Sequence, residues 1–197
     1  MEAVIPRLVA ISLAAVTLLI ALGRHAEARN GSPATDPSPL AECAGAESLP
    51  AGSGGSVSSP RVLEELVGRW EGSGQLFGAP ATFVMSWTPV LDGRFLELEY
   101  EIRAAVRLKA RADYRVAEGE RLRGVWIDSR GEILSLAATA TDSTLVTEWT
   151  STTESGRTVY RIDGPATLEV CDFVSDGPGW RLFGVARYTR TAETPRP

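Results

Sequence analysis

Two polar side chains near the C-terminus, Tyr188 and Arg190, have the types and the spacing needed to hold a carboxylate. They lie two residues apart, so an extended strand would direct both side chains to one face. The residues of the same parity upstream are small or apolar: Leu182, Gly184 and Ala186. If this face is inward, the buried guanidinium needs an anionic partner, either a ligand carboxylate or an internal acid such as Asp172. The alternative is that Arg190 lies at a frayed strand end and faces water.

Indole rings would supply an apolar wall beside such a polar contact. Four of the five tryptophans lie in alternating segments on the face that is otherwise apolar or glycine-rich, and Met85 shares that face with one of them. The candidate ligand-binding residues are therefore Trp70, Met85, Trp87, Trp126, Trp149, Tyr188 and Arg190. Two interpretations stay open, because inward rings either line a ligand cavity or fill a tightly packed core.

The residue patterns of the common enzyme classes are missing from the sequence. The only histidine, His25, lies in the N-terminal segment, which excludes a histidine-based triad, metal site or haem site from the rest of the chain. We find no G-x-S-x-G, phosphate loop, dinucleotide fingerprint or metal-spaced cluster. Asp128 and Asp172 are the pair that we consider for two-carboxylate hydrolysis. We expect no cofactor, and enzymatic activity stays an open question.

Cys43 and Cys171 are the two cysteines of the chain. In an exported protein, two cysteines can persist as a disulfide. The apolar residues of the segment 167–175 have the opposite parity to Cys171, which places Cys171 on the outer face beside Glu169. There Cys43 could reach it from the N-terminal segment. The alternative is two unpaired thiols.

The N-terminal part of the chain has the order of an export signal. Arg7 precedes an apolar run over residues 8–23, and Ala26-Glu27-Ala28 forms a small-x-small cleavage site. In residues 31–60, Gly, Ser, Pro and Ala supply 22 of 30 residues, a composition typical of a flexible linker. We predict four parts: a signal peptide or N-terminal anchor over 1–28, a disordered linker over 29–59, a barrel domain over 60–192 and a tail over 193–197.

Elements that position the candidate residues follow from patterning with period two. Ser59 and Pro60 predict the start of a short helix that Gly68 ends. Alternation bounded by turn signals then predicts strands at 69–77, 81–91, 94–103, 107–117, 121–129, 132–141, 144–154, 157–163, 167–175 and 180–191. Short connections favour an all-β, antiparallel up-and-down barrel of about ten strands, because closure removes exposed edges. A two-sheet sandwich is the alternative.

Charge patterning supports one strand pairing and argues against one class of partner. The acidic residues Glu97, Glu99 and Glu101 precede the basic residues Arg107, Lys109 and Arg111 on consecutive strands. Paired in a hairpin, they would form a ladder of opposite charges on the outer surface. The net charge of −5 argues against a dedicated nucleic-acid binder.

Three segments together carry a family resemblance. They are Leu66-Val67-Gly68-Arg69-Trp70-Glu71-Gly72-Ser73-Gly74, Trp87-Thr88-Pro89-Val90-Leu91-Asp92-Gly93-Arg94-Phe95-Leu96 and Trp126-Ile127-Asp128-Ser129. The chain resembles the DUF1579 family and, more distantly, the calycin barrels, which include lipocalins, fatty-acid-binding proteins and nitrobindin-like haem proteins. This resemblance covers residues 61–191 and implies a barrel with an apolar interior. Nitrobindin-like proteins bind haem through a histidine, which this domain lacks.

Fatty-acid-binding barrels hold a carboxylate with an Arg and a Tyr two apart on the last strand. Here the order is reversed, with Tyr188 before Arg190.

The export signal, the strand pattern and the family resemblance together predict an exported lipocalin-like barrel, periplasmic or extracellular. We expect it to bind a small apolar or amphiphilic ligand and no nucleic acid. Its only membrane contact would be an uncleaved N-terminal anchor. The alternatives are a non-catalytic structural or protein-interaction domain of the cell envelope with a fully packed core and, third, a hydrolase.

Overall fold

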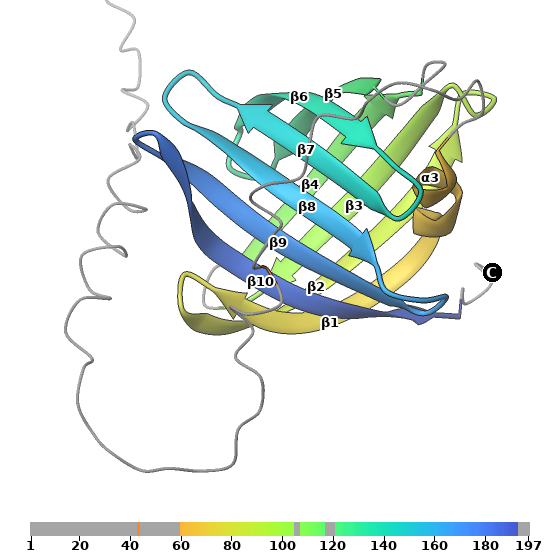
Figure 1. Ribbon diagram of the computed structural model, residues 1–197, viewed down its shortest axis with the longest axis horizontal. Coiled ribbons are helices and arrows are strands. Elements are labelled where there is room, and N and C mark those ends of the chain that lie inside the picture. The colour runs from red at the N-terminus through yellow and green to blue at the C-terminus, as the bar shows by residue number, and fades with distance from the viewer. Residues whose placement is uncertain (1–42, 44–59, 105–106, 117–120, 193–197) are drawn as a thin grey trace, which may run out of the picture. The chain divides into compact units, whose positions relative to one another are not determined.

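The computed structural model describes residue 43 and residues 60–104, 107–116 and 121–192. One short helix precedes ten strands in this part of the chain (Figure 1). The helix is α3 (Arg61–Leu66), and the strands are β1 (Gly68–Leu76), β2 (Ala79–Val90), β3 (Phe95–Arg103), β4 (Arg107–Arg115), β5 (Arg121–Asp128), β6 (Ile133–Ala140), β7 (Thr144–Thr150), β8 (Ser155–Ile162), β9 (Thr167–Asp176) and β10 (Gly179–Thr191). The predicted all-β class and the number of strands are confirmed.

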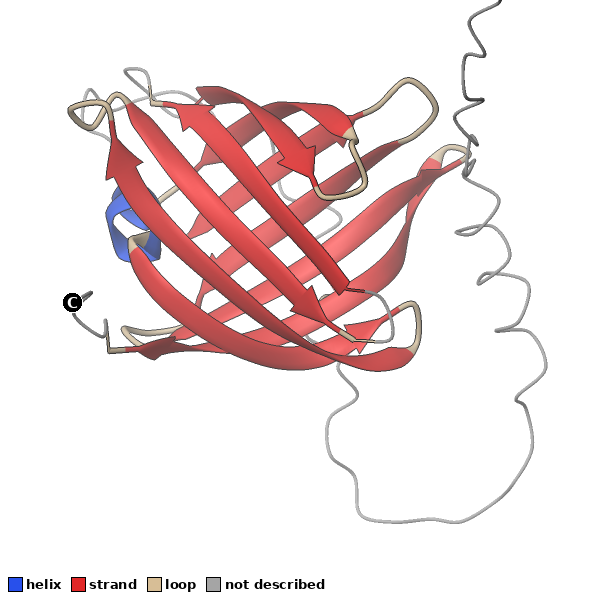
Figure 2. Ribbon diagram, turned by 180° about the vertical axis from the view of Figure 1, so that it is seen from behind, coloured by secondary structure: helices blue, strands red, loops and turns tan. Residues whose placement is uncertain are grey.

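The ten strands form one closed antiparallel barrel (Figure 2). Each strand pairs with its neighbours in sequence, and β1 pairs with β10 to close the ring. Closure gives every strand two hydrogen-bonded neighbours, so no backbone edge is left for pairing with another chain. The predicted up-and-down barrel is therefore confirmed, and the alternative of a two-sheet sandwich is wrong.

The predicted charge ladder lies between β3 and β4 on the outer wall. Glu99 stands opposite Arg111, and Glu101 stands opposite Lys109. The Nε atom of Arg111 is also 3.0 Å from Oε2 of Glu97, its diagonal neighbour. Cross-strand pairs of opposite charge each contribute roughly 0.2–1 kcal/mol, so the ladder helps to fix the register of this hairpin.

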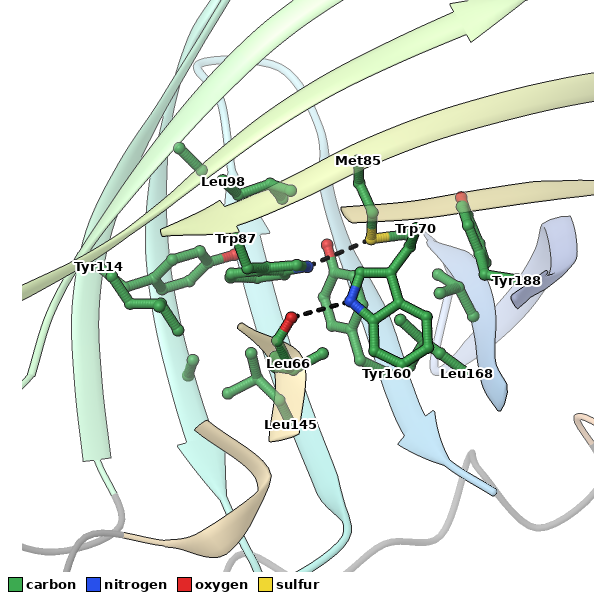
Figure 3. Packing of buried hydrophobic residues seen from close by; sticks show 14 of the residues in the cluster. Leu66, Trp70, Met85, Trp87, Leu98, Tyr114, Leu145, Tyr160, Leu168 and Tyr188 are labelled. Carbon is green, nitrogen blue, oxygen red and sulfur yellow. Dashed lines mark hydrogen bonds between the residues drawn. The ribbon is translucent and has the colours of Figure 1, made fainter. Parts of the chain in front are cut away.

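Helix α3 closes one end of the barrel. Its apolar side chains Val62, Leu63 and Leu66 are buried, and the carbonyl of Leu66 accepts a hydrogen bond of 2.8 Å from Nε1 of Trp70 (Figure 3). The helix begins one residue later than the sequence predicts, because Pro60 occupies the N-cap position rather than the first helical position. The carbonyl of Pro60 accepts the amide of Leu63.

A β-bulge in β10 changes which residues face inward near the start of this strand. The register with β9 shifts between Leu182 and Gly184. Gly184 and Tyr188 face the barrel interior, as the alternation predicts. Leu182 instead packs on the outer wall beside Phe173 and Val185. The prediction that Leu182 shares the inward face is therefore wrong, because the extra residue inverts the alternation upstream of the bulge.

Cys43 and Cys171 form a disulfide with a Cα–Cα distance of 6.1 Å. Cys171 is on the outer face of β9, and the bridge joins an apolar cluster on the wall formed with Val159, Phe173 and Val185. All of these residues are at most 9% exposed.

Three of the predicted parts of the chain lie outside the described residues: the signal segment 1–28, the linker 29–59 except for Cys43, and the tail 193–197. Within the described residues, no helix has the length and hydropathy that crossing a bilayer requires.

Candidate functional site

The inward side chains of the barrel differ in accessibility. Near α3, the inward side chains are buried, among them Leu96, Leu122, Leu145 and Leu168. Farther from α3 the burial is mixed: Ala81, Phe83, Ile102 and Leu108 are buried too, whereas a further set of inward side chains keeps partial accessibility. These residues, which we call the accessible half, are Leu76, Tyr100, Ala110, Trp126, Leu134, Trp149, Thr158, Asp172 and Val174. These side chains are therefore partly accessible, unlike those packed around Trp70 and Trp87.

Three of the predicted ligand-binding residues belong to the packed half. Trp70, Met85 and Trp87 are at most 1% exposed. The indole of Trp87 points Nε1 at Sδ of Met85, 3.2 Å away, and its ring meets those of Tyr114 and Tyr160 at centroid distances of 5.7 and 5.4 Å (Figure 3). Close packing of this kind leaves no room for a ligand, so the structure places these three residues in the core.

Two other predicted residues, Trp126 and Trp149, form part of the wall of the accessible half. The ring centroid of Trp126 is 5.7 Å from that of Tyr100, and its Nε1 donates to Oδ2 of Asp128 at 3.4 Å. Trp149 lies flat on Gly156, where a Cβ atom would be 1.9 Å from Cζ2 of the indole. The glycine is therefore what lets this ring lie against the wall.

The polar centre of the accessible half is Asp172 on β9. Its Oδ1 accepts a hydrogen bond of 2.7 Å from the hydroxyl of Thr158, its register partner on β8. Its Oδ2 lies beside Gly184 of β10, where a Cβ would be 2.9 Å away. Burial raises the pKa of Asp172 to about 6, although the Thr158 hydrogen bond lowers it. A carboxyl group in this state is mostly ionised at pH 7 and poorly solvated.

All four tyrosines of the chain point into the barrel. Tyr100 and Tyr188 interact through their hydroxyls, as do Tyr114 and Tyr160. The Tyr114 hydroxyl is also 3.3 Å from Oγ1 of Thr147. Burial raises the pKa of Tyr114 to about 12 and raises those of the other three as well, with the charge of Asp172 adding to the effect. The interior hydroxyls are therefore neutral donors and acceptors at physiological pH.

Asp128, the second carboxylate considered for hydrolysis, is engaged in the β5–β6 turn. Its Oδ2 pairs with Nη2 of Arg130 at 2.6 Å, and its Oδ1 accepts the Arg130 backbone amide at 2.8 Å. Burial alone would raise the pKa of Asp128, but the Arg130 bonds outweigh it and hold the pKa below its usual value. This carboxylate caps its own turn and also accepts the indole N–H of Trp126 from β5. No group of three or more potential metal ligands is present in the described part of the chain.

Arg190 lies at the packed end of the barrel rather than in the accessible half. Its guanidinium donates to the carbonyls of Glu65, Val67 and Pro165, and its Cζ is 4.2 Å from the centroid of the Trp70 ring. Backbone carbonyls and an indole face therefore compensate its charge. A role for Arg190 in ligand binding stays a prediction, and its present contacts tie α3 to the barrel.

The alternation of inward and outward positions along the strands predicts some residues of the accessible half but not others. Inward alternation predicts Trp126 and Trp149 as ligand-binding residues, and Asp172 only as an internal acid or hydrolytic group. The same pattern does not single out Tyr100 or Thr158. The signal that would have found Thr158 and Asp172 is a polar residue at an inward position of an otherwise apolar face, because such residues need a partner or a function.

Comparisons with known proteins bear on the fold. No family model and no curated protein matches the chain, so the resemblance to the DUF1579 family stays a prediction. Among solved structures, Rv2717c from M. tuberculosis superposes with a TM-score of 0.50 at 17% identity, covering 68% of this chain and 99% of that one. The S-type phycobiliprotein lyase CPES from Guillardia theta gives 0.49 at 13%, covering 67% and 92%. A redesigned β-barrel gives 0.43 at 13%, covering 68% and 99%. The likeness to Rv2717c supports the barrel fold and nothing beyond it.

Proposed function

We propose that this protein is an exported, lipocalin-like carrier that binds a small apolar or amphiphilic ligand in the accessible half of its barrel. The observation that supports this proposal is the uneven burial of the interior. Trp70 and Trp87 are sealed in the core, whereas Trp126, Trp149 and Asp172 keep accessible surface on inward faces. Apolar walls with a few polar groups are typical of ligand sites in barrels of this size.

The disulfide is consistent with the proposed export. Cystines persist in oxidising compartments and are rare in the cytosol of most organisms, and Cys43 and Cys171 form such a bridge. Intact-mass analysis of the protein from its native host tests this part of the proposal. A chain that begins near residue 29, found outside the cytoplasm, supports export with signal cleavage. A full-length cytoplasmic product contradicts export.

Ligand binding is tested by calorimetric titration with three naphthyl compounds that differ in their polar group. They are a naphthylmethyl amine, the corresponding alcohol, and naphthoate. Binding of at least one probe to the wild type, weakened tenfold or more by Trp126→Ala, supports the proposed site. Trp180→Ala is the matched control, because Trp180 packs on the outer wall. If the folded wild type binds none of the three probes, the alternative of a structural domain is favoured.

A further inference from the structure

We propose that the ligand of this barrel carries a protonated amine on its apolar body, and that Asp172 is the counter-ion of that amine. The inference rests on the proposed function and adds the chemical class of the ligand. Its basis is a carboxylate inside the barrel, on a partly accessible residue, with one oxygen that accepts no hydrogen bond from the described residues.

The two oxygens of Asp172 have different surroundings. Oδ1 is bonded to the Thr158 hydroxyl at 2.7 Å. Oδ2 accepts no hydrogen bond from the described residues, whereas the Thr158 hydroxyl occupies only Oδ1. Oδ2 lies against Gly184, which puts no side chain next to it.

No cationic group of the described residues neutralises Asp172. Burial and the Thr158 hydrogen bond alone account for the shifted pKa of Asp172, and Arg130 and Arg190 are engaged elsewhere, with Asp128 and with backbone carbonyls near α3. Burying a carboxylate without a counter-charge is costly. A cationic ligand would supply the missing charge, and an ammonium group would also donate a hydrogen bond to Oδ2.

Aromatic rings around this carboxylate favour the same class of ligand. The electrostatic influence of Asp172 reaches the hydroxyls of Tyr100, Tyr160 and Tyr188, and Tyr100 packs on Trp126. Ring faces attract cations, most strongly where water is excluded. A ligand carboxylate would instead bring a second negative charge next to Asp172. The site therefore selects against the fatty acids that the resemblance to fatty-acid-binding barrels implies.

The pH dependence of binding follows from the groups that face Asp172. They are the Thr158 hydroxyl and the three tyrosines, whose pKa values burial holds above the usual value. None of them titrates near neutral pH, so Asp172 itself, with a pKa of about 6, controls the charge. A cation binds the ionised form, so affinity for an amine should weaken about tenfold between pH 7.5 and pH 5.

The experiment compares the naphthylmethyl amine with the alcohol of the same body, by calorimetry at pH 7.5 and pH 5. In the wild type, we expect the amine to bind at least tenfold more tightly than the alcohol at pH 7.5. Asp172→Asn should abolish this preference and leave the affinity for the alcohol within about threefold. Asp176→Asn is the matched control, because Asp176 lies on the same strand with its side chain 64% exposed. Thr158→Val keeps the acid and should retain the preference.

Three outcomes separate the two proposals. Tight amine binding that depends on Asp172 and weakens at pH 5 supports both. Equal binding of the amine and the alcohol in the wild type, or a preference for naphthoate, overturns the amine inference and leaves the carrier proposal standing. Absence of binding for all three probes overturns both. A cooperative thermal transition must show that Asp172→Asn is folded. If this variant does not fold, the wild type tests the amine inference: its preference for the amine over the alcohol should be lost at pH 5.

Discussion

Trp70 and Arg190 face each other across the seam where the barrel closes. They are register partners in the β1–β10 pair, and Cζ of Arg190 is 4.2 Å from the centroid of the indole. The same guanidinium donates to the carbonyls of Glu65 and Val67 at the end of α3, and the indole donates to Leu66. The first strand, the last strand and the helix are thus joined at one point.

Replacing Arg190 should therefore destabilise the barrel. Arg190→Met keeps the aliphatic stem but removes the donors to the helix carbonyls and the cation over the ring, so we expect the free energy of unfolding to fall by about 1–3 kcal/mol. Urea denaturation measures this change. Arg181→Met is the control, because Arg181 is an exposed residue of the same strand, paired with Asp176, and exposed pairs contribute little. Equal effects of the two substitutions would contradict the role of Arg190 at the seam.

Most of the fold was predictable because it depends on local patterns. Alternation places Leu96, Leu98 and Tyr100 on one face of β3 whatever the rest of the chain does, and turn residues such as Asp92-Gly93 mark where strands end. Short turns between ten such strands leave few alternatives to a meander. The bulge beside Leu182 was not predictable, because it depends on the fit of β10 to β9 and has no signal in the alternation.

The site was only partly predictable, because parity gives the face of a residue and not its depth. Trp87 and Trp126 have the same inward parity, yet the first is sealed near α3 and the second keeps accessible surface. How deeply an inward side chain is buried depends on the tertiary packing around it, including that of α3. The contacts of Arg190 with that helix depend on tertiary placement in the same way, and neither can be derived from spacing.

Enlarging Gly156 should displace the ring of Trp149. A Cβ at this position would be 1.9 Å from Cζ2 of the indole, which is impossible without moving the ring. We expect Gly156→Ala to lower the free energy of unfolding by about 1–3 kcal/mol, as overpacking does, and to shift tryptophan emission. Ser155→Ala, one residue earlier on β8, is the control and should leave the emission unchanged. An unchanged spectrum in Gly156→Ala would show that the ring does not lie on this glycine.

Asp172 should make the empty barrel less stable as the pH rises. Its pKa is about 6 in the folded protein against an ordinary value of 3.8, so the folded state keeps a proton that the unfolded state releases. The unfolding free energy therefore falls between about pH 4 and pH 6 and is constant, as far as this group is concerned, above that range. At pH 8 the cost is up to about 3 kcal/mol, from about 1.4 kcal/mol per pKa unit.

Asp172→Asn removes this cost and should stabilise the protein at pH 8 but not at pH 4. Urea denaturation at the two pH values gives the comparison, with Asp176→Asn as the control for removing an exposed carboxylate of the same strand. A destabilised Asp172→Asn at pH 8 would mean that the carboxylate has a protein partner that compensates its charge. Such a result would also weaken the case for a cationic ligand.

Removing the Cys43–Cys171 bridge should lower the stability of the barrel without unfolding it. The bridge joins residues 128 apart in sequence, and the chain-entropy model gives about 5 kcal/mol for a closed loop of that length. The barrel itself is closed by β1 and β10, neither of which contains a cysteine, so its fold does not depend on the bridge. We expect Cys43→Ser to lower the urea midpoint and leave the far-ultraviolet spectrum unchanged.

The double variant Cys43→Ser/Cys171→Ser separates the cross-link from the packing around it. Cys171 is 5% exposed within the outer apolar cluster that includes Phe173 and Val159, so a polar hydroxyl there adds a desolvation cost that Cys43→Ser alone avoids. The double variant should therefore be less stable than Cys43→Ser, and reductant should destabilise the wild type but neither variant. If reductant leaves the urea midpoint of the wild type unchanged, the bridge contributes nothing to the stability of the fold.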